Sequence, residues 1–187
     1  NTLNRLPNPF ATPPRRRSSQ RSVNTQPAIE VLEERVMLTA FVVDSNLDTV
    51  DANDGQTTLR EAINTANAHT GLDTISFNIG VGGPQTIVLA SALPTVTDQI
   101  TIDGSTQPGI TIDATGITDN VVLFLDGNAD GTTLKDFAIR DSGAIFAVLI
   151  NGVTGSLIDG LDLSHDGSTA AGVGLGLVNF DNNTVRN

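Results

Sequence analysis

Short β-rich runs recur along this chain at a nearly constant spacing, and this regularity restricts the fold more than any other feature. Phe137 and Ile139 in KDFAI recur 24 residues later as Leu161 and Leu163 in IDGLDL. A similar distance separates the FLD triplet at 124–126 from the LIN triplet at 149–151, and glycine follows each triplet. A period in the twenties, built of strands and tight turns, predicts a solenoid in which successive coils stack.

The turn residues favour parallel coils over antiparallel hairpins. A sandwich or barrel would place Asp-Gly or Asn-Gly pairs in two-residue loops between alternating strands. Here such pairs end the runs at the coil period, at 103–104, 126–127, 151–152 and 159–160. A leucine-rich repeat has a similar period, but its asparagine-bearing consensus and its helix in each repeat are missing. We therefore predict an all-β solenoid, a right-handed parallel β-helix, from the runs at 86–89, 99–103, 109–113, 121–126, 133–139, 147–151, 156–163 and 173–180.

One helix is expected before the coils, over about residues 58–68. Thr58 and Glu61 stand at capping-box spacing, and Leu59, Ala62, Ile63 and Ala66 fall on one helical face. Asn67, His69 and Gly71 provide a stop. An amphipathic helix in this position predicts a plug over one end of the stack.

The segment 41–77 carries a family resemblance. FVVDSNLDTVDANDG leads into TTLREAI and then GLDTISF, and this arrangement resembles the CSLREA-type domain. Thr57 stands at the position of the family's cysteine, so any role of that thiol is absent. LEERVMLTA at 32–40 is similar to the LEPR-XLL motif, with Glu34 in place of the proline. The resemblance implies the start of a pectate-lyase-like β-helix region in a large, secreted or envelope-associated bacterial protein, and it implies no catalytic residue.

Charge divides the chain into a basic arm and an acidic body. The first 27 residues hold five arginines and no acid, whereas residues 28–187 hold all 21 acids and five bases. Prolines and few large apolar residues predict that residues 1–40 are a disordered leader containing the LEPR-XLL-like motif. Phe10 is the only aromatic residue among these arginines and no nucleic-acid-binding fold follows them, so a nucleic-acid partner is not expected. No apolar stretch has the length of a membrane span.

Residues 41–187 are expected to form the cap and the first four to five coils of the β-helix. The sequence ends within VNFDNNTVRN, in the middle of an expected coil and without a polar cap for the last rung. We therefore expect this chain to continue into, or to stack on, further coils.

The clearest candidate metal site is DGNADG at 126–131. Asp126, Asn128 and Asp130 alternate with small residues before Gly131, an arrangement of oxygen ligands that can bind calcium. Phe137 stands where an EF-hand would need glutamate. The alternative interpretation is an acidic corner whose side chains cap their own backbone, with Asp126, Asn151 and Asn179 forming a hydrogen-bonded ladder along the stack.

A polysaccharide lyase would need a base and cations. Lys135, Arg140 and His165 are the only basic candidates within the repeats, and Asp136 and Asp159 could hold a metal. Lys135 and Asp136 are expected at consecutive positions of one strand, facing opposite sides. Arg140 and His165 are expected at comparable corners of successive coils, where a solvated pair is the alternative.

The composition disfavours a glycan-cleaving groove. The sequence has no tryptophan or tyrosine and seven phenylalanines, most of which we expect in the core. The acidic body would repel a polyanion. The sequence therefore predicts a non-catalytic scaffold, similar to an adhesin, that binds a surface glycan or protein ligand and needs no cofactor. The alternatives are a polysaccharide lyase with its active site beyond residue 187 and a calcium-stabilised structural module.

Overall fold

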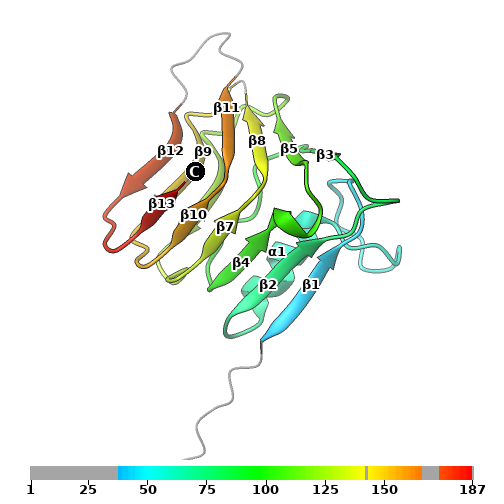
Figure 1. The fold of residues 1–187 in the computed structure, drawn as a ribbon, viewed down its shortest axis with the longest axis horizontal. Coiled ribbons are helices and arrows are strands. Elements are labelled where there is room, and N and C mark those ends of the chain that lie inside the picture. Colours follow the sequence, from blue (N-terminus) through cyan, green and yellow to red (C-terminus); the bar gives the residue numbers. More distant parts are fainter. Residues whose placement is uncertain (1–37, 142, 166–172, 187) are drawn as a thin grey trace, which may run out of the picture. The chain divides into compact units, whose positions relative to one another are not determined.

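The computed structural model describes residues 38–141, 143–165 and 173–186. The predicted leader, including its LEPR-XLL-like motif, lies outside these residues except for its last positions. The described chain forms three parallel sheets that the polypeptide visits in turn, coil after coil (Figure 1). These three sheets are called sheets A, B and C below.

Sheet A has six strands, in the order β1 (Thr39–Val43), β2 (Asp73–Phe77), β4 (Ile100–Asp103), β7 (Thr133–Lys135), β10 (Leu157–Asp159) and β13 (Thr184–Arg186). Sheet B contains β3 (Gln85–Val88), β5 (Ile110–Ala114), β8 (Ala138–Asp141) and β11 (Asp162–His165). Sheet C contains β6 (Val121–Asp126), β9 (Phe146–Asn151) and β12 (Val173–Val178).

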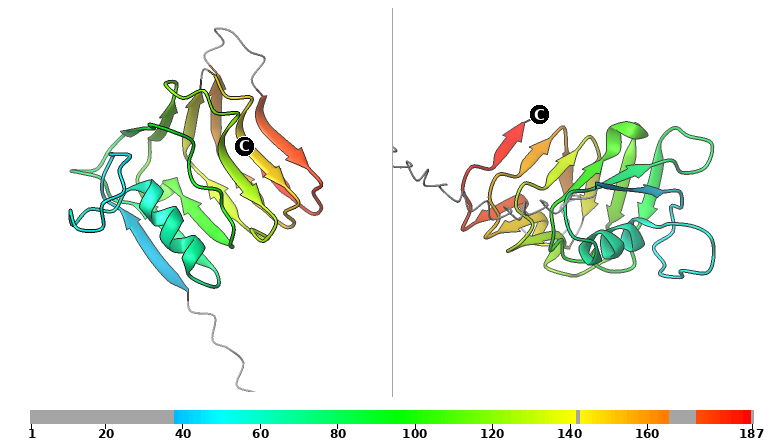
Figure 2. Two further views of the ribbon diagram at one scale, coloured as in Figure 1. Left: turned by 180° about the vertical axis from the view of Figure 1, so that it is seen from behind. Right: turned by 90° about the horizontal axis from the view of Figure 1, so that it is seen from below.

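Every pairing between these strands is parallel. The chain passes from sheet A to B to C and back to A in about four right-handed turns (Figures 1 and 2). The predicted parallel β-helix is therefore confirmed, and antiparallel hairpins are excluded for the described strands.

The predicted repeat is confirmed at the level of register. Ile139 pairs with Leu163 in sheet B, and Leu125 pairs with Ile150 in sheet C. The period varies along sheet A, however: Asp73 aligns with Ile100, Thr101 with Thr133, Thr133 with Leu157, and Leu157 with Thr184. The coils differ because their corners differ in length, and the corner between β4 and β5 is longer than the one between β7 and β8.

Two of the predicted β-strand segments were too long. Residues 133–139 and 156–163 each form two short strands in different sheets, β7 with β8 and β10 with β11. Asp136 makes the first of these corners with a φ of 59°. Aspartate tolerates this left-handed conformation, so the chain turns sharply without a glycine.

The interior is a stack of aliphatic columns. Ile75, Ile102, Leu134 and Ile158 occupy aligned inward positions of sheet A and are almost fully buried. The outward positions beside them are polar except for Leu157, which gives the period-two alternation of a sheet with one buried face. Burial of these columns stabilises the coil.

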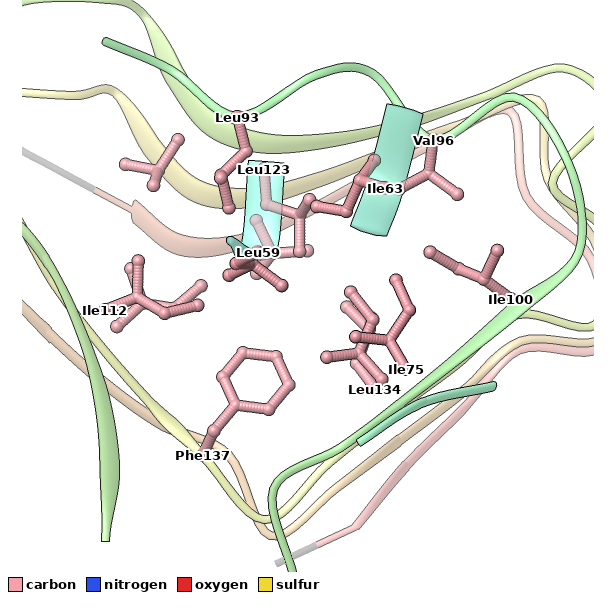
Figure 3. Packing of buried hydrophobic residues seen from close by; sticks show 14 of the residues in the cluster. Leu59, Ile63, Ile75, Leu93, Val96, Ile100, Ile112, Leu123, Leu134 and Phe137 are labelled. Atoms are coloured by element: carbon pink, nitrogen blue, oxygen red, sulfur yellow. The ribbon is translucent and has the colours of Figure 1, made fainter. Parts of the chain in front are cut away.

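The helix α1 (Leu59–Ala68) lies in the first coil, at one end of the stack, and packs against β1 and β2 (Figure 2). Its capping box is present: the Thr58 side chain accepts from the Glu61 amide, and Glu61 accepts from the Thr58 amide. Leu59, Ala62, Ile63 and Ala66 are buried, and Figure 3 shows Leu59 and Ile63 facing the same interior as Ile75 and Leu134. The predicted capping helix is thus confirmed.

Candidate functional site

A groove of about 410 Å³ lies at the corner between sheets A and B, and it is called the corner groove below. One wall is the long turn between β4 and β5, which begins with the short 3-10 helix η1 (Gly104–Thr106). Tight corners of the next two coils form the rest. Its lining residues are Ser105, Pro108, Gly109, Ile110, Thr111, Asp136, Phe137, Ala138, Gly160 and Asp162.

The groove exists because one corner is longer than those stacked on it. Asp103 aligns with Lys135, and Thr111 aligns with Ala138. Asp103 and Thr111 are therefore eight residues apart in the sequence, whereas the positions aligned with them in the next coil, Lys135 and Ala138, are three residues apart. The additional residues project beside the stack, whereas Asp136 and Phe137 stay close to it. The carboxylates of Asp136 and Asp162 give the groove an acidic lining.

A column of alternating charge runs up the outer face of sheet A next to this groove. Asp103, Lys135, Asp159 and Arg186 occupy aligned positions of successive strands. The Lys135 Nζ atom lies 2.9 Å from Asp103 Oδ2, and an Arg186 Nη2 atom lies 3.2 Å from Asp159 Oδ2. Lys135, one of the predicted lyase bases, therefore neutralises a carboxylate of the neighbouring coil.

The pKa directions agree with this geometry. The hydrogen bond to Asp103 raises the pKa of Lys135 above its usual value. Burial raises the pKa of Asp103, but hydrogen bonds from Ser105 and Lys135 outweigh it, so that this pKa lies below its usual value. A Lys135 side chain held as a cation is poorly suited to remove a proton at neutral pH.

Arg140 and His165 lie on adjacent strands of sheet B but not at equivalent positions. Arg140 aligns with Ser164 and Asp113, and His165 aligns with Asp141. The predicted pair is therefore offset by one residue in the register of sheet B. The Thr115 hydroxyl and amide hydrogen bonds, and more weakly the charge of Arg140, outweigh the effect of burial and hold the pKa of Asp113 below its usual value.

The DGNADG loop at 126–131 forms the corner between sheet C and sheet A. Asp126, Asn128 and Asp130 are all exposed there. The Asp130 Oδ1 atom accepts hydrogen bonds from the Thr154 amide, at 2.6 Å, and the Thr154 hydroxyl, at 3.1 Å. This carboxylate thus caps a turn of the next coil. Among the described residues, no three His, Asp or Glu side chains gather closely enough to hold a metal on their own.

One rung of the predicted polar ladder is present at the same corner. The Asn179 Nδ2 group donates to Asn151 Oδ1 at 3.2 Å, and Asp126 aligns with Asn151 in the sheet.

The expectation that most phenylalanines are in the core was wrong for the described residues. Phe77 and Phe137 are buried, whereas Phe41, Phe124 and Phe146 are half-buried and Phe180 is exposed.

The LREA sequence of the helix makes side-chain contacts that hold the helix to neighbouring segments. Arg60 binds both carboxylate oxygens of Asp48 at 2.8 Å and donates to the carbonyls of Ser91 and Ala92. Glu61 accepts the amides of Asp51 and Thr58, and the Thr58 amide bond is the main cause that lowers the pKa of Glu61. These contacts join the helix to the loop before it and to the first coil.

Sequence reasoning missed a buried carboxylate near this helix. Asp73 is 0% exposed and lies 3.3 Å from the Nδ1 atom of His69. The signal was available, because the alternation in DTISF places Asp73 on the same face as Ile75 and Phe77.

No family model, curated protein or solved structure matches this chain. The functional argument therefore rests on the geometry of the described residues. No described helix is long and apolar enough to cross a membrane.

Proposed function

We propose that this chain is a non-catalytic β-helix scaffold that binds a surface glycan or protein ligand through the side of its coils. The observation that carries the proposal is the pairing of the basic side chains. Lys135 contacts Asp103, Arg186 contacts Asp159, and Arg140 lies in register with Asp113. A lyase would need such cations directed at a substrate carboxylate rather than at the protein's own acids.

The corner groove is the proposed binding surface. Its lining includes the apolar residues Ile110 and Phe137 and the polar residues Ser105, Asp136 and Asp162. A partly apolar lining with a few polar groups is typical of a ligand site. Its acidic lining favours a neutral or cationic ligand over a uronate polymer.

The resemblance to the CSLREA-type and LEPR-XLL-type segments supports a secreted or cell-envelope location and stacking on further coils. A rigid solenoid suits this role because it presents an extended surface without a moving part. Lyase chemistry beyond residue 187 and stabilisation of the DGNADG loop by calcium are the competing proposals.

The test uses the 187-residue chain with an array of neutral, cationic and uronate-bearing glycans and with envelope protein fractions. We expect binding that weakens at least about tenfold in Asp136→Asn/Asp162→Asn, because both changes alter the groove lining. Asp126→Asn is the matched control, since Asp126 is exposed at a different corner. Equal binding by both variants would refute the corner groove as the binding surface. Ultraviolet detection of an unsaturated product from polygalacturonate would refute the non-catalytic role.

A further inference from the structure

The outer face of sheet C differs from the outer faces of sheets A and B. On sheet A the outward positions are mainly threonines and the charged column that contains Asp103 and Lys135. On sheet B they include Asp113, Arg140 and Ser164. Sheet C instead carries apolar side chains on both of its faces. A sheet that faces water normally has one polar face, so the outer face of sheet C is suited to a partner other than water.

The burial patterns of β6 and β9 show which side chains point outward. Both strands begin with the order half-buried, buried, buried, half-buried, buried. The half-buried positions coincide in register, because Val121 aligns with Phe146 and Phe124 aligns with Leu149. These four side chains are not among the described residues that pack on the core cluster. They therefore lie on the outside of sheet C, and they are called the apolar face below.

The Phe146 ring lies across the neighbouring strand on this face. Gly176 of β12 aligns with Leu149, and a Cβ atom added to Gly176 would lie 2.6 Å from both Cδ1 and Cε1 of Phe146 and 2.9 Å from Leu149 Cδ1. The ring thus occupies the space above the glycine that a side chain would otherwise fill. Phe146 is only half-buried, so part of its ring remains open to solvent.

Hydrogen-bonding groups border the apolar face. Asp126 and Asn151 align with each other at the ends of β6 and β9. Asp126 is exposed, and Asn151 Oδ1 accepts a hydrogen bond from Asn179 Nδ2 at 3.2 Å. An apolar patch bordered by polar groups is typical of an interaction site.

The size of the apolar face limits its partner. Strands lie about 4.8 Å apart and rise about 3.3 Å per residue, so three strands and the step from Phe146 to Leu149 cover roughly 10 Å by 10 Å. A stable protein–protein interface needs about 800 Å² on each partner. A face on the order of 100 Å² is too small for a protein or for a second copy of this chain, but it matches a short stretch of a glycan chain.

A neutral glycan fits both parts of this surface. In a β-linked glucan the C–H groups of each ring form an apolar, weakly positive face that stacks on the negative face of a phenylalanine ring. Asp126 and Asn151 can exchange hydrogen bonds with the sugar hydroxyls. The acidic body would repel a uronate.

We propose that the apolar face of sheet C binds a neutral β-linked glucan, with Phe124 and Phe146 as the stacking residues. This site is separate from the corner groove. It rests on the proposed function only for the class of ligand, a glycan.

The experiment measures the binding of cellohexaose to the 187-residue chain by isothermal titration calorimetry. Phe146→Leu and Phe124→Leu should each weaken binding by about fivefold to tenfold, because leucine keeps the apolar bulk and lacks the ring face. Phe77→Leu is the matched control and should leave binding unchanged, since Phe77 is 3% exposed in the interior. Hexagalacturonate should bind at least about tenfold more weakly than cellohexaose.

A second measurement uses the unaltered chain, which covers a variant that fails to fold. The sequence has seven phenylalanines and no tryptophan or tyrosine, so NMR can follow the phenylalanine rings without overlap from other large aromatic side chains. Cellohexaose should shift the ring resonances of Phe124 and Phe146 and leave those of the buried Phe77 unchanged.

The proposal is overturned if Phe77→Leu weakens binding as much as Phe146→Leu does, or if cellohexaose shifts neither ring in the unaltered chain. If Asp136→Asn/Asp162→Asn abolishes cellohexaose binding and Phe146→Leu does not, the corner groove is the glycan site and only the present proposal fails. The opposite result supports the apolar face and removes the groove as the site for this glycan. A dimer in sedimentation experiments that Phe146→Leu abolishes would assign the face to a second copy and would also overturn the proposal.

Discussion

Gly104 offers a sharp test of how tightly successive coils fit. This glycine begins η1 and lies against the corner of the next coil. A Cβ atom added there would overlap the backbone oxygen of Asp136, and it would lie 2.8 Å from the Asp136 carbonyl carbon and 3.0 Å from the Phe137 Cβ. Backbone atoms cannot rotate away as a side chain can, so Gly104→Ala must separate two coils.

The expected loss is near the upper end of the range for overpacking. Such changes usually destabilise by about 1–3 kcal/mol. With about 2–4 °C per kcal/mol for a chain of this size, a loss of about 3 kcal/mol lowers the melting temperature by roughly 6–12 °C. The corner groove should also lose its shape, because Gly104 anchors the turn that forms one wall.

Two other glycines are matched controls. Gly116 has no atoms within 4 Å of an added Cβ and no left-handed φ, so Gly116→Ala should change stability by less than about 1 kcal/mol. Gly152 also has open space but a φ of 70°, so Gly152→Ala should lose about 1–2 kcal/mol through conformation alone. Urea unfolding followed by circular dichroism measures all three variants. Equal stability of Gly104→Ala and Gly116→Ala would refute the contact between coils.

Three further predictions concern the cap, the core and pH. Arg60→Met should destabilise the chain by about 3–5 kcal/mol in urea unfolding, because it leaves the 4% exposed Asp48 carboxylate without its cation; a loss below 1 kcal/mol would contradict this. Leu134→Ala should lose about 2–5 kcal/mol, whereas Leu47→Ala, at a side chain that is 50% exposed, should lose far less. The folded-state pKa values of Glu61, Asp103 and Asp113 lie below their unfolded values. Their contribution is therefore complete above about pH 4.5 and is lost as the pH falls through the folded values. Asp103→Asn should flatten the acid limb of a plot of melting temperature against pH, and an unchanged limb would exclude Asp103 as a contributor. Lys135 has a raised pKa, so its contribution should disappear only above about pH 10.5.

The parts of the fold that repeat were predictable from sequence. The echo between Ile139 and Leu163 identified residues that do align, because each coil must place an aliphatic side chain in the same column. The capping helix was equally readable from Thr58 and Glu61, since both capping interactions are local.

The corners were less predictable. Asp136 turns the chain without glycine, so its left-handed conformation had no clear signal in the sequence. The one-residue offset between Arg140 and His165 depends on where β8 and β11 begin, which the apolar pattern leaves uncertain by a residue. The corner groove was missed because it arises from the difference between two coils rather than from a motif in either coil.

The interior position of Asp73 was visible in the alternation of DTISF, but its neighbours were not. Thr39 and His69 come from segments 30 residues apart, and their proximity follows from the path of the helix between β1 and β2. Sequence spacing alone does not specify that path.

The long turn between β4 and β5 has a consequence for how such a protein can change. On both sides of this turn the strands keep the alignment of the neighbouring coil, with Asp103 opposite Lys135 and Thr111 opposite Ala138. The five additional residues therefore leave the cross-section unaltered. An inserted peptide epitope or a natural length polymorphism at this point should be tolerated, and the same insertion between Lys135 and Ala138 should displace the turn stacked against it.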